Sequence, residues 1–124
     1  MNISENFTSK ELGIDNIFDS GIIINMCMLT HRILQPLRDK LRMPLTINSG
    51  YRTPEHNLKV GGARNSQHMK GQAVDFTCYD LNMAYTILET MEFDQLILYK
   101  NFIHISYNLG LNRNQIIIKS RKEV

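Results

Sequence analysis

Apolar residues between positions 21 and 41 recur at the spacing of an α-helix. The stripe that they form contains Met26, Leu29, Ile33 and Leu37, and it is widened by Leu34 and Leu41. Spacings of three and four residues are typical of a helix that packs one face against a core. We therefore predict a long helix that ends before Pro44. A kink or a break is expected at Pro36, because proline has no N–H for the carbonyl of Arg32.

Shorter alternating segments in the rest of the chain predict strands. These segments are 45–48, 72–78, 95–99, 102–107 and 115–118, and the two-residue gap at 100–101 suits a tight hairpin. A short helix is expected to start at Pro54 with Thr53 as its cap, and another is expected after Asn82 as its cap. The glycine-rich stretch 60–71 is expected to be a loop. This order of elements is typical of the α+β class, with a small, mainly antiparallel sheet and helices packed on one face.

Composition limits the class of protein more than its activity. The chain has 124 residues, of which 43% are hydrophobic and 21% charged, so we predict one domain spanning residues 1–124. A net charge of +2 does not mark a nucleic-acid binder, and the basic run at 119–122 is interpreted as a solvated terminus. Cys27 and Cys78 form no Cys-x-x-Cys pair and are predicted to be reduced, buried thiols.

The first residues and the apolar stretches of the chain bear on export and membrane insertion. Its first residues show no basic start followed by an apolar run, and no later stretch reaches the roughly 18 apolar residues of a membrane span. We therefore expect synthesis in the cytoplasm without a signal peptide, and no membrane span.

The four histidines differ in their surroundings. His31 and His56 lie in predicted helices without an acid or a second histidine at an obvious chelating spacing, so a structural role is expected for both. His68 lies in the predicted loop, seven residues before Asp75 on a predicted strand. Strand alternation turns Asp75 away from the core-facing Val74, Phe76 and Cys78, and it places His104 on the polar face between Ile103 and Ile105.

Two imidazoles and one carboxylate would meet if the strands of Asp75 and His104 are neighbours. His68, Asp75 and His104 would then leave a fourth position open, as in catalytic zinc sites. The alternative is a salt bridge between a histidine and the aspartate without a metal ion. Two nitrogens and one oxygen favour zinc over other divalent ions.

The segments around these residues resemble the zinc D-alanyl-D-alanine carboxypeptidase family of murein peptidases. The most specific of them is the string Ser-x-His-x-x-Gly-x-Ala-x-Asp at 66–75, followed by His-x-Ser at 104–106. The other similar segments are 7–12, 34–38, 49–57, 60–63 and 93–97. The resemblance covers nearly the whole chain in order.

This resemblance implies a fold like that of the hedgehog and DD-peptidase domains, with a single zinc peptidase-like domain. It implies that His68, Asp75 and His104 bind one zinc ion, that Arg52 holds a substrate carbonyl or carboxylate, and that Ser66 lines the substrate cleft. A solvated or structural arginine is the alternative for Arg52. The implied activity is zinc-dependent hydrolysis of a peptide bond in peptidoglycan stem peptides by metal-activated water. A D-Ala-D-Ala carboxypeptidase and an endolysin-type endopeptidase both fit, and we expect a monomer that acts on the cell wall after release, encoded by a phage or prophage.

The sequence departs from the family in one respect. Its members usually carry an acid shortly before the last zinc histidine, and no Asp or Glu lies between Gln95 and His104. The expected places are occupied by Asn101 and Tyr99. Tyr99 is a candidate proton donor or oxyanion partner, with a half-buried strand tyrosine as the alternative. The missing acid also supports a second hypothesis, a catalytically weakened zinc domain that serves as a murein-binding or phage structural module.

Overall fold

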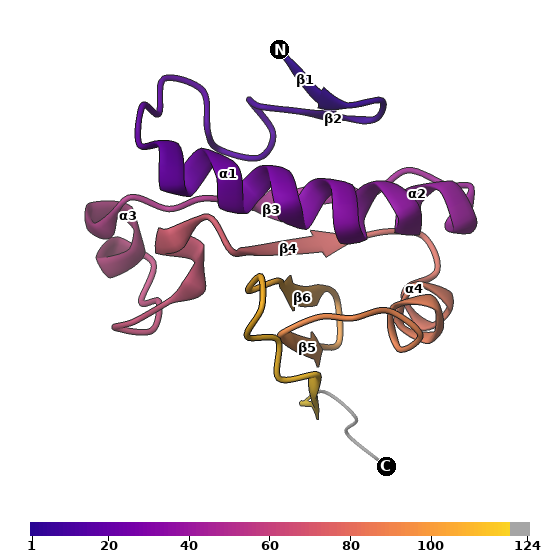
Figure 1. Ribbon diagram of the computed structural model, residues 1–124. Helices are drawn as coiled ribbons and strands as arrows, with labels where there is room; N and C mark the ends of the chain where they lie inside the picture. Colours follow the sequence, from indigo (N-terminus) through magenta and orange to yellow (C-terminus); the bar gives the residue numbers. More distant parts are fainter. Residues whose placement is uncertain (120–124) are drawn as a thin grey trace.

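The computed structural model describes residues 1–119 of the chain (Figure 1), so the basic run at 119–122 lies outside the described residues except for Lys119. The elements in chain order are β1 (Asn2–Ser4), β2 (Phe7–Thr8), α1 (Ser20–Leu29), the π-helical turn η1 (Thr30–Leu34), α2 (Gln35–Leu41), β3 (Thr46–Ser49), α3 (Pro54–Lys59), the 3₁₀-helix η2 (Gln67–Lys70), β4 (Ala73–Thr77), α4 (Leu81–Leu88), β5 (Gln95–Leu98), β6 (Ile103–Ser106) and β7 (Gln115–Ile118).

Five strands form one sheet in the order β3-β4-β6-β5-β7. Every neighbouring pair is antiparallel except β5 and β7, which run parallel. The predicted α+β class and mainly antiparallel sheet are therefore confirmed. A separate two-stranded sheet of β1 and β2 was not predicted, because strands of three and two residues are too short to show alternation.

The predicted long helix is present as α1, η1 and α2 in direct succession (Figure 1). All six apolar residues of the predicted stripe are buried. The helix does not break at Pro36. Instead it widens into a π-helical turn just before the proline, where the N–H of Gln35 donates to the carbonyl of Thr30, five residues back. A wider turn of this kind interrupts the regular hydrogen-bond pattern of the α-helix next to the proline, which has no N–H to donate, and the helix continues beyond it.

The two faces of the sheet have different surroundings. The side chains of Val74, Phe76, Leu96, Leu98, Ile103 and Ile105 join the helices in one buried core. Asp75, Ile97 and His104 alternate with them and line a cleft on the opposite face. One face of the sheet is thus bound to the helices, and the other is left for polar side chains, as the alternation predicted.

Three details of the prediction need correction. The cap of α4 is Asp80, whose side chain accepts a hydrogen bond of 3.0 Å from the N–H of Met83, and Asn82 lies exposed inside the helix. The predicted loop at 60–71 contains the 3₁₀-helix η2. Cys27 and Cys78 are free as predicted, but both are half-buried rather than buried.

None of the helices within residues 1–119 is long and apolar enough to cross a membrane.

Candidate metal centre

Asp75 and His104 face each other across two hydrogen-bonded strands. They are directly opposed in the antiparallel register of β4 and β6, so their side chains leave the same face of the sheet. The Nδ1 atom of His104 lies 2.8 Å from Oδ1 of Asp75. The condition on which the cluster depended, that the two strands are neighbours, is met, and the close approach of these side chains follows from that pairing.

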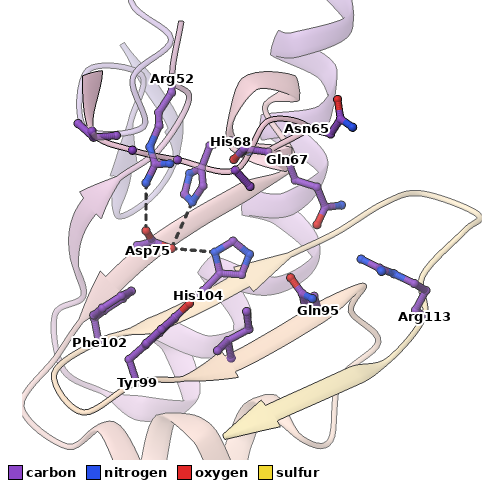
Figure 2. A pocket seen from close by; sticks show the side chains of 16 residues that line it. Arg52, Asn65, Gln67, His68, Asp75, Gln95, Tyr99, Phe102, His104 and Arg113 are labelled. Carbon is purple, nitrogen blue, oxygen red and sulfur yellow. Dashed lines mark hydrogen bonds and ion pairs between the residues drawn. The ribbon is translucent and has the colours of Figure 1, made fainter. Parts of the chain in front are cut away.

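His68 reaches the same carboxylate from the 3₁₀-helix η2. Ser66 caps this helix, its Oγ accepting a hydrogen bond of 3.1 Å from the N–H of His68. Gly71 ends the helix in the left-handed conformation (φ 73°), which suits glycine because it has no Cβ. The ring of His68 is thereby held with Nε2 3.2 Å from Oδ1 of Asp75 (Figure 2).

The hydrogen bonds of His68 test whether this group suits a metal ion. Its Nδ1 lies 2.8 Å from the carbonyl oxygen of Gly50, which only accepts, so the proton of the neutral ring is on Nδ1. With Nδ1 protonated, Nε2 and the carboxylate of Asp75 are close enough to need a cation between them, either a proton on Nε2, as in a salt bridge, or a metal ion. A backbone carbonyl that fixes the tautomer in this way is typical of metal-binding histidines.

The spacing of the three side chains also suits one small ion. The ligand atoms of His68, Asp75 and His104 lie within 4.8 Å of one another, the only such group of acids, histidines and cysteines in residues 1–119. Ligands at zinc bond lengths in a tetrahedron are roughly 3.3–3.6 Å apart, close to the separations of 3.2 and 2.8 Å from Asp75. The residues therefore fit a bound zinc ion.

The carboxyl group of Asp75 is held in its charged form. Burial acts to raise its pKa, but hydrogen bonds from the rings of His104 and His68, together with their charge, hold the pKa well below its ordinary value. A ligand that is already deprotonated does not have to lose a proton when a metal ion binds.

Arg52 lies beside the three side chains, with every nitrogen of its guanidinium engaged. Nε donates to Ser49 at 3.0 Å, Nη1 donates to Asn57 at 3.1 Å, and Nη2 lies 3.5 Å from Oδ2 of Asp75. Its backbone N–H donates to the carbonyl of His68 at 3.0 Å. These contacts hold both the arginine and the second oxygen of Asp75 in place.

Gly62 leaves the space that Arg52 and Asn57 occupy. A Cβ at this position would lie 2.1 Å from Oδ1 of Asn57 and 2.9 Å from Nη1 of Arg52. The buried Asn57 is fixed from its other side by a hydrogen bond of 2.8 Å to the carbonyl of Ala63. Neither side chain has room to retreat without losing a partner.

We therefore expect Gly62→Ala to displace Arg52. The overpacking should lower the free energy of unfolding by about 1–3 kcal/mol. It should also lower the affinity for any ligand that Arg52 binds. Thermal unfolding and ligand titration measure the two effects. Gly61→Ala is the control: its φ of 73° brings backbone strain, but no atom of residues 1–119 lies within 4 Å of the added Cβ. Equal ligand affinity in Gly62→Ala and the wild type would contradict this account.

The three side chains lie in a cleft of about 520 Å³. Its lining also includes Arg52, Ser66 and Tyr99, so the predicted site residues share one cavity. Tyr99 is half-buried directly after β5, stacks on Phe102 with ring centroids 4.3 Å apart, and has its hydroxyl end turned toward His104 (Figure 2). Asp75 is the only acidic side chain among the described residues that line the cleft. His31 and His56 are exposed and outside it.

A second polar group borders the cleft and was not predicted. The buried carboxylate of Asp94 accepts hydrogen bonds from the backbone N–H, Nε and Nη2 of Arg113 at 2.9, 3.0 and 2.9 Å. It also accepts one of 2.8 Å from Nε2 of Gln67, the residue before His68. The only sequence signal was Asp94 itself, a charged residue at the start of an apolar strand. Nothing in the sequence indicated its partners.

The pair of Asp94 and Arg113 should make stability depend on pH. The hydrogen bond from Arg113 holds the pKa of Asp94 below its ordinary value of 3.8, so its contribution is complete above that pH and is lost as the pH falls below it. Asp94→Asn is expected to cost about 1–3 kcal/mol at pH 7. Denaturant unfolding at several pH values measures it, and a difference from the wild type that does not shrink below pH 3.8 would contradict the assignment.

Comparison with known proteins agrees with this geometry. Residues 5–106 match the family model described as Peptidase M15. The zinc D-Ala-D-Ala carboxypeptidase of Streptomyces albus G is 38% identical over 77 residues, which make up 56% of this chain and 30% of that relative. The matched part is thus under a third of the relative's length. Because the family model covers most of the chain, including all three of the clustered side chains, this protein belongs to the Peptidase M15 family.

Proposed function

We propose that this protein is a zinc-dependent peptidase that hydrolyses a peptide bond in peptidoglycan stem peptides. The observation that carries the proposal is the convergence of His68, Asp75 and His104 on one point inside an open cleft. Membership of the Peptidase M15 family and the relative named as a zinc D-Ala-D-Ala carboxypeptidase support it. The proposed hydrolysis has two forms. One is removal of a terminal D-alanine, and the other is cleavage within the stem by an endolysin of a phage or prophage.

The roles of the residues follow from their positions. His68, Asp75 and His104 would hold the zinc ion, which when bound supplies an activated water and polarises a carbonyl near neutral pH. Arg52 stands beside Asp75 and would donate a hydrogen bond to a substrate oxygen on that side of the cleft. Ser66 shapes the wall of the cleft and caps the helix that carries His68. Tyr99, with its hydroxyl turned toward His104, would supply a proton to the leaving amine.

Digestion of purified peptidoglycan by the zinc-loaded protein tests this proposal. Mass spectrometry of the products should show new free amines, and the mass that is lost distinguishes a released D-alanine from an internal cut. Protein stripped of metal by a chelator should leave the stems intact, and added zinc should restore cleavage. Intact stems after incubation with zinc-loaded protein, under conditions in which the Streptomyces albus G enzyme cuts them, would overturn the proposal.

A second candidate function is a catalytically weakened domain that binds murein peptides or forms part of a phage particle. The observation that favours it is the lining of the cleft, where Asp75 is the only acid among the described residues and Tyr99 stands at a place expected for a general base. Peptide binding that survives in His68→Ala, without turnover by the wild type, would support the binding module. Loss of binding together with metal would argue against it.

A further inference from the structure

Arg113 lies at the end of the cleft away from Arg52. Figure 2 shows the two arginines on opposite sides of the histidines and Asp75, with the guanidinium of Arg113 turned back toward Gln67 and the cleft. Arg113 belongs to the segment between β6 and β7, and it follows the part of the chain that matches the family model.

A guanidinium has two edges that can each donate two parallel hydrogen bonds to a carboxylate. Asp94 takes the edge formed by Nε and Nη2, at 3.0 and 2.9 Å. The edge formed by Nη1 and the second hydrogen of Nη2 has no partner among residues 1–119, and 57% of the Arg113 side chain is exposed. Arg113 therefore presents one complete pair of donors to the solvent of the cleft.

The free edge is held in a fixed direction. The side chain of Asp94 is only 2% exposed, and it is fixed by the backbone N–H of Arg113 and by Gln67 as well as by the guanidinium. A donor pair that is fixed before binding loses little conformational entropy when a ligand arrives. Arg52 differs, because each of its three nitrogens already donates to a different protein group, which leaves single hydrogens for a substrate, and its side chain is only 14% exposed.

We propose that Arg113 is a substrate-binding residue whose free edge binds a carboxylate of the peptide at the end of the cleft opposite Arg52. This inference rests on the proposed function, since it assigns the chemical class of the substrate as a peptide with a carboxylate at a distance from the bond that is cut. The carboxylate belongs either to the C-terminus of the peptide or to an acidic residue within it. Because Asp94 already neutralises the charge of Arg113, recognition depends on the geometry of the donor pair more than on net charge.

The test compares the affinity of the zinc-loaded protein for three synthetic peptides, measured as KM for any peptide that is cut and by NMR titration for any that is not. The first is the stem pentapeptide L-Ala-D-isoGlu-L-Lys-D-Ala-D-Ala, the second is its C-terminal amide, and the third carries D-isoglutamine in place of D-isoglutamate. The wild type should bind the first peptide roughly tenfold more tightly than the amide that lacks the recognised carboxylate. The analogue that binds weakly identifies the source of the carboxylate.

Two variants and one control connect this difference with Arg113. Arg113→Gln removes both edges, and Arg113→Lys keeps a charge that can pair with Asp94 but lacks the second edge. Both should bind all three peptides equally, with the affinity of the wild type for the weak analogue. Arg64→Gln should behave as the wild type, because Arg64 is exposed and outside the cleft lining. Thermal unfolding checks that the variants are folded.

The other outcomes contradict the proposal in distinct ways. If the variants discriminate between the peptides as the wild type does, or lose affinity for all three peptides equally, Arg113 has only a structural role. If the wild type binds none of the peptides or does not discriminate between them, the inference also fails. If Arg113-dependent discrimination is found but no peptide is hydrolysed, only the proposed hydrolysis is overturned.

Discussion

His104→Ala is expected to release the metal ion and to abolish hydrolysis. The substitution removes one of three converging ligands and leaves the carboxylate of Asp75 without its 2.8 Å partner. Loss of an outer partner of a metal ligand already costs about 10–100-fold in metal affinity, so loss of the ligand itself should cost at least about 100-fold. Zinc content after dialysis, competition with a chromophoric chelator and kcat/KM on stem peptides measure the effect.

His31→Ala is the matched control for this experiment. His31 is exposed on the long helix, outside the cleft, so its removal should change neither zinc affinity nor turnover. Circular dichroism should show that both variants are folded, since the buried core contains neither histidine. Zinc bound to His104→Ala with the affinity of the wild type would overturn the assignment of the metal centre.

Tyr99→Phe is expected to lower kcat by about 100-fold while KM and zinc content stay near their wild-type values. The ring stacked on Phe102 remains, so only the hydroxyl turned toward His104 is lost. Proton transfer by a positioned side chain contributes about 10²–10⁴ in rate, and a single phenol should lie at the lower end. Steady-state kinetics at pH 7 measure this change, with the exposed Tyr79 replaced by Phe as the control.

Tyr99→Glu separates the two candidate functions. If Tyr99 is the proton donor, Tyr99→Phe loses turnover, and an acid at the same place keeps part of it. If the domain is catalytically weakened, Tyr99→Phe leaves a very low rate unchanged, whereas Tyr99→Glu raises it by supplying the missing carboxylate. Unchanged kcat in an active protein after Tyr99→Phe would remove Tyr99 from the mechanism.

The long helix and the polar faces of the strands were predictable because both depend on local geometry. Residues three and four apart share a helix face whatever lies opposite, and alternate residues of a strand point to opposite sides. This is why the stripe from Met26 to Leu41 is buried, and why Asp75 and His104 are turned away from the core. The cap of α4 was less predictable, since Asp80 and Asn82 are both good caps and the backbone conformation selects between them.

Other features depend on contacts between segments far apart in the sequence. Asp94 is 27 residues from Gln67 and 19 residues from Arg113, and no periodic pattern relates them. The clash that keeps Gly62 a glycine arises from the side chains of Arg52 and Asn57, which approach it only in the folded chain. Apart from Arg52, for which the family resemblance implied a role, these residues could be assigned no role from the sequence.

The sequence by itself determined which side chains are available for the metal centre and which face of each strand they occupy. Only the tertiary structure decided that they meet, because β4 pairs with β6 in the register that sets Asp75 opposite His104. A shift of that register by one residue would turn the histidine into the core. The third side chain of the candidate metal centre, His68, is brought to the same point by η2, where Ser66, Gly71 and the carbonyl of Gly50 orient its ring. Burial of the apolar face against the helices selects this pairing, and the meeting of the three side chains follows from it.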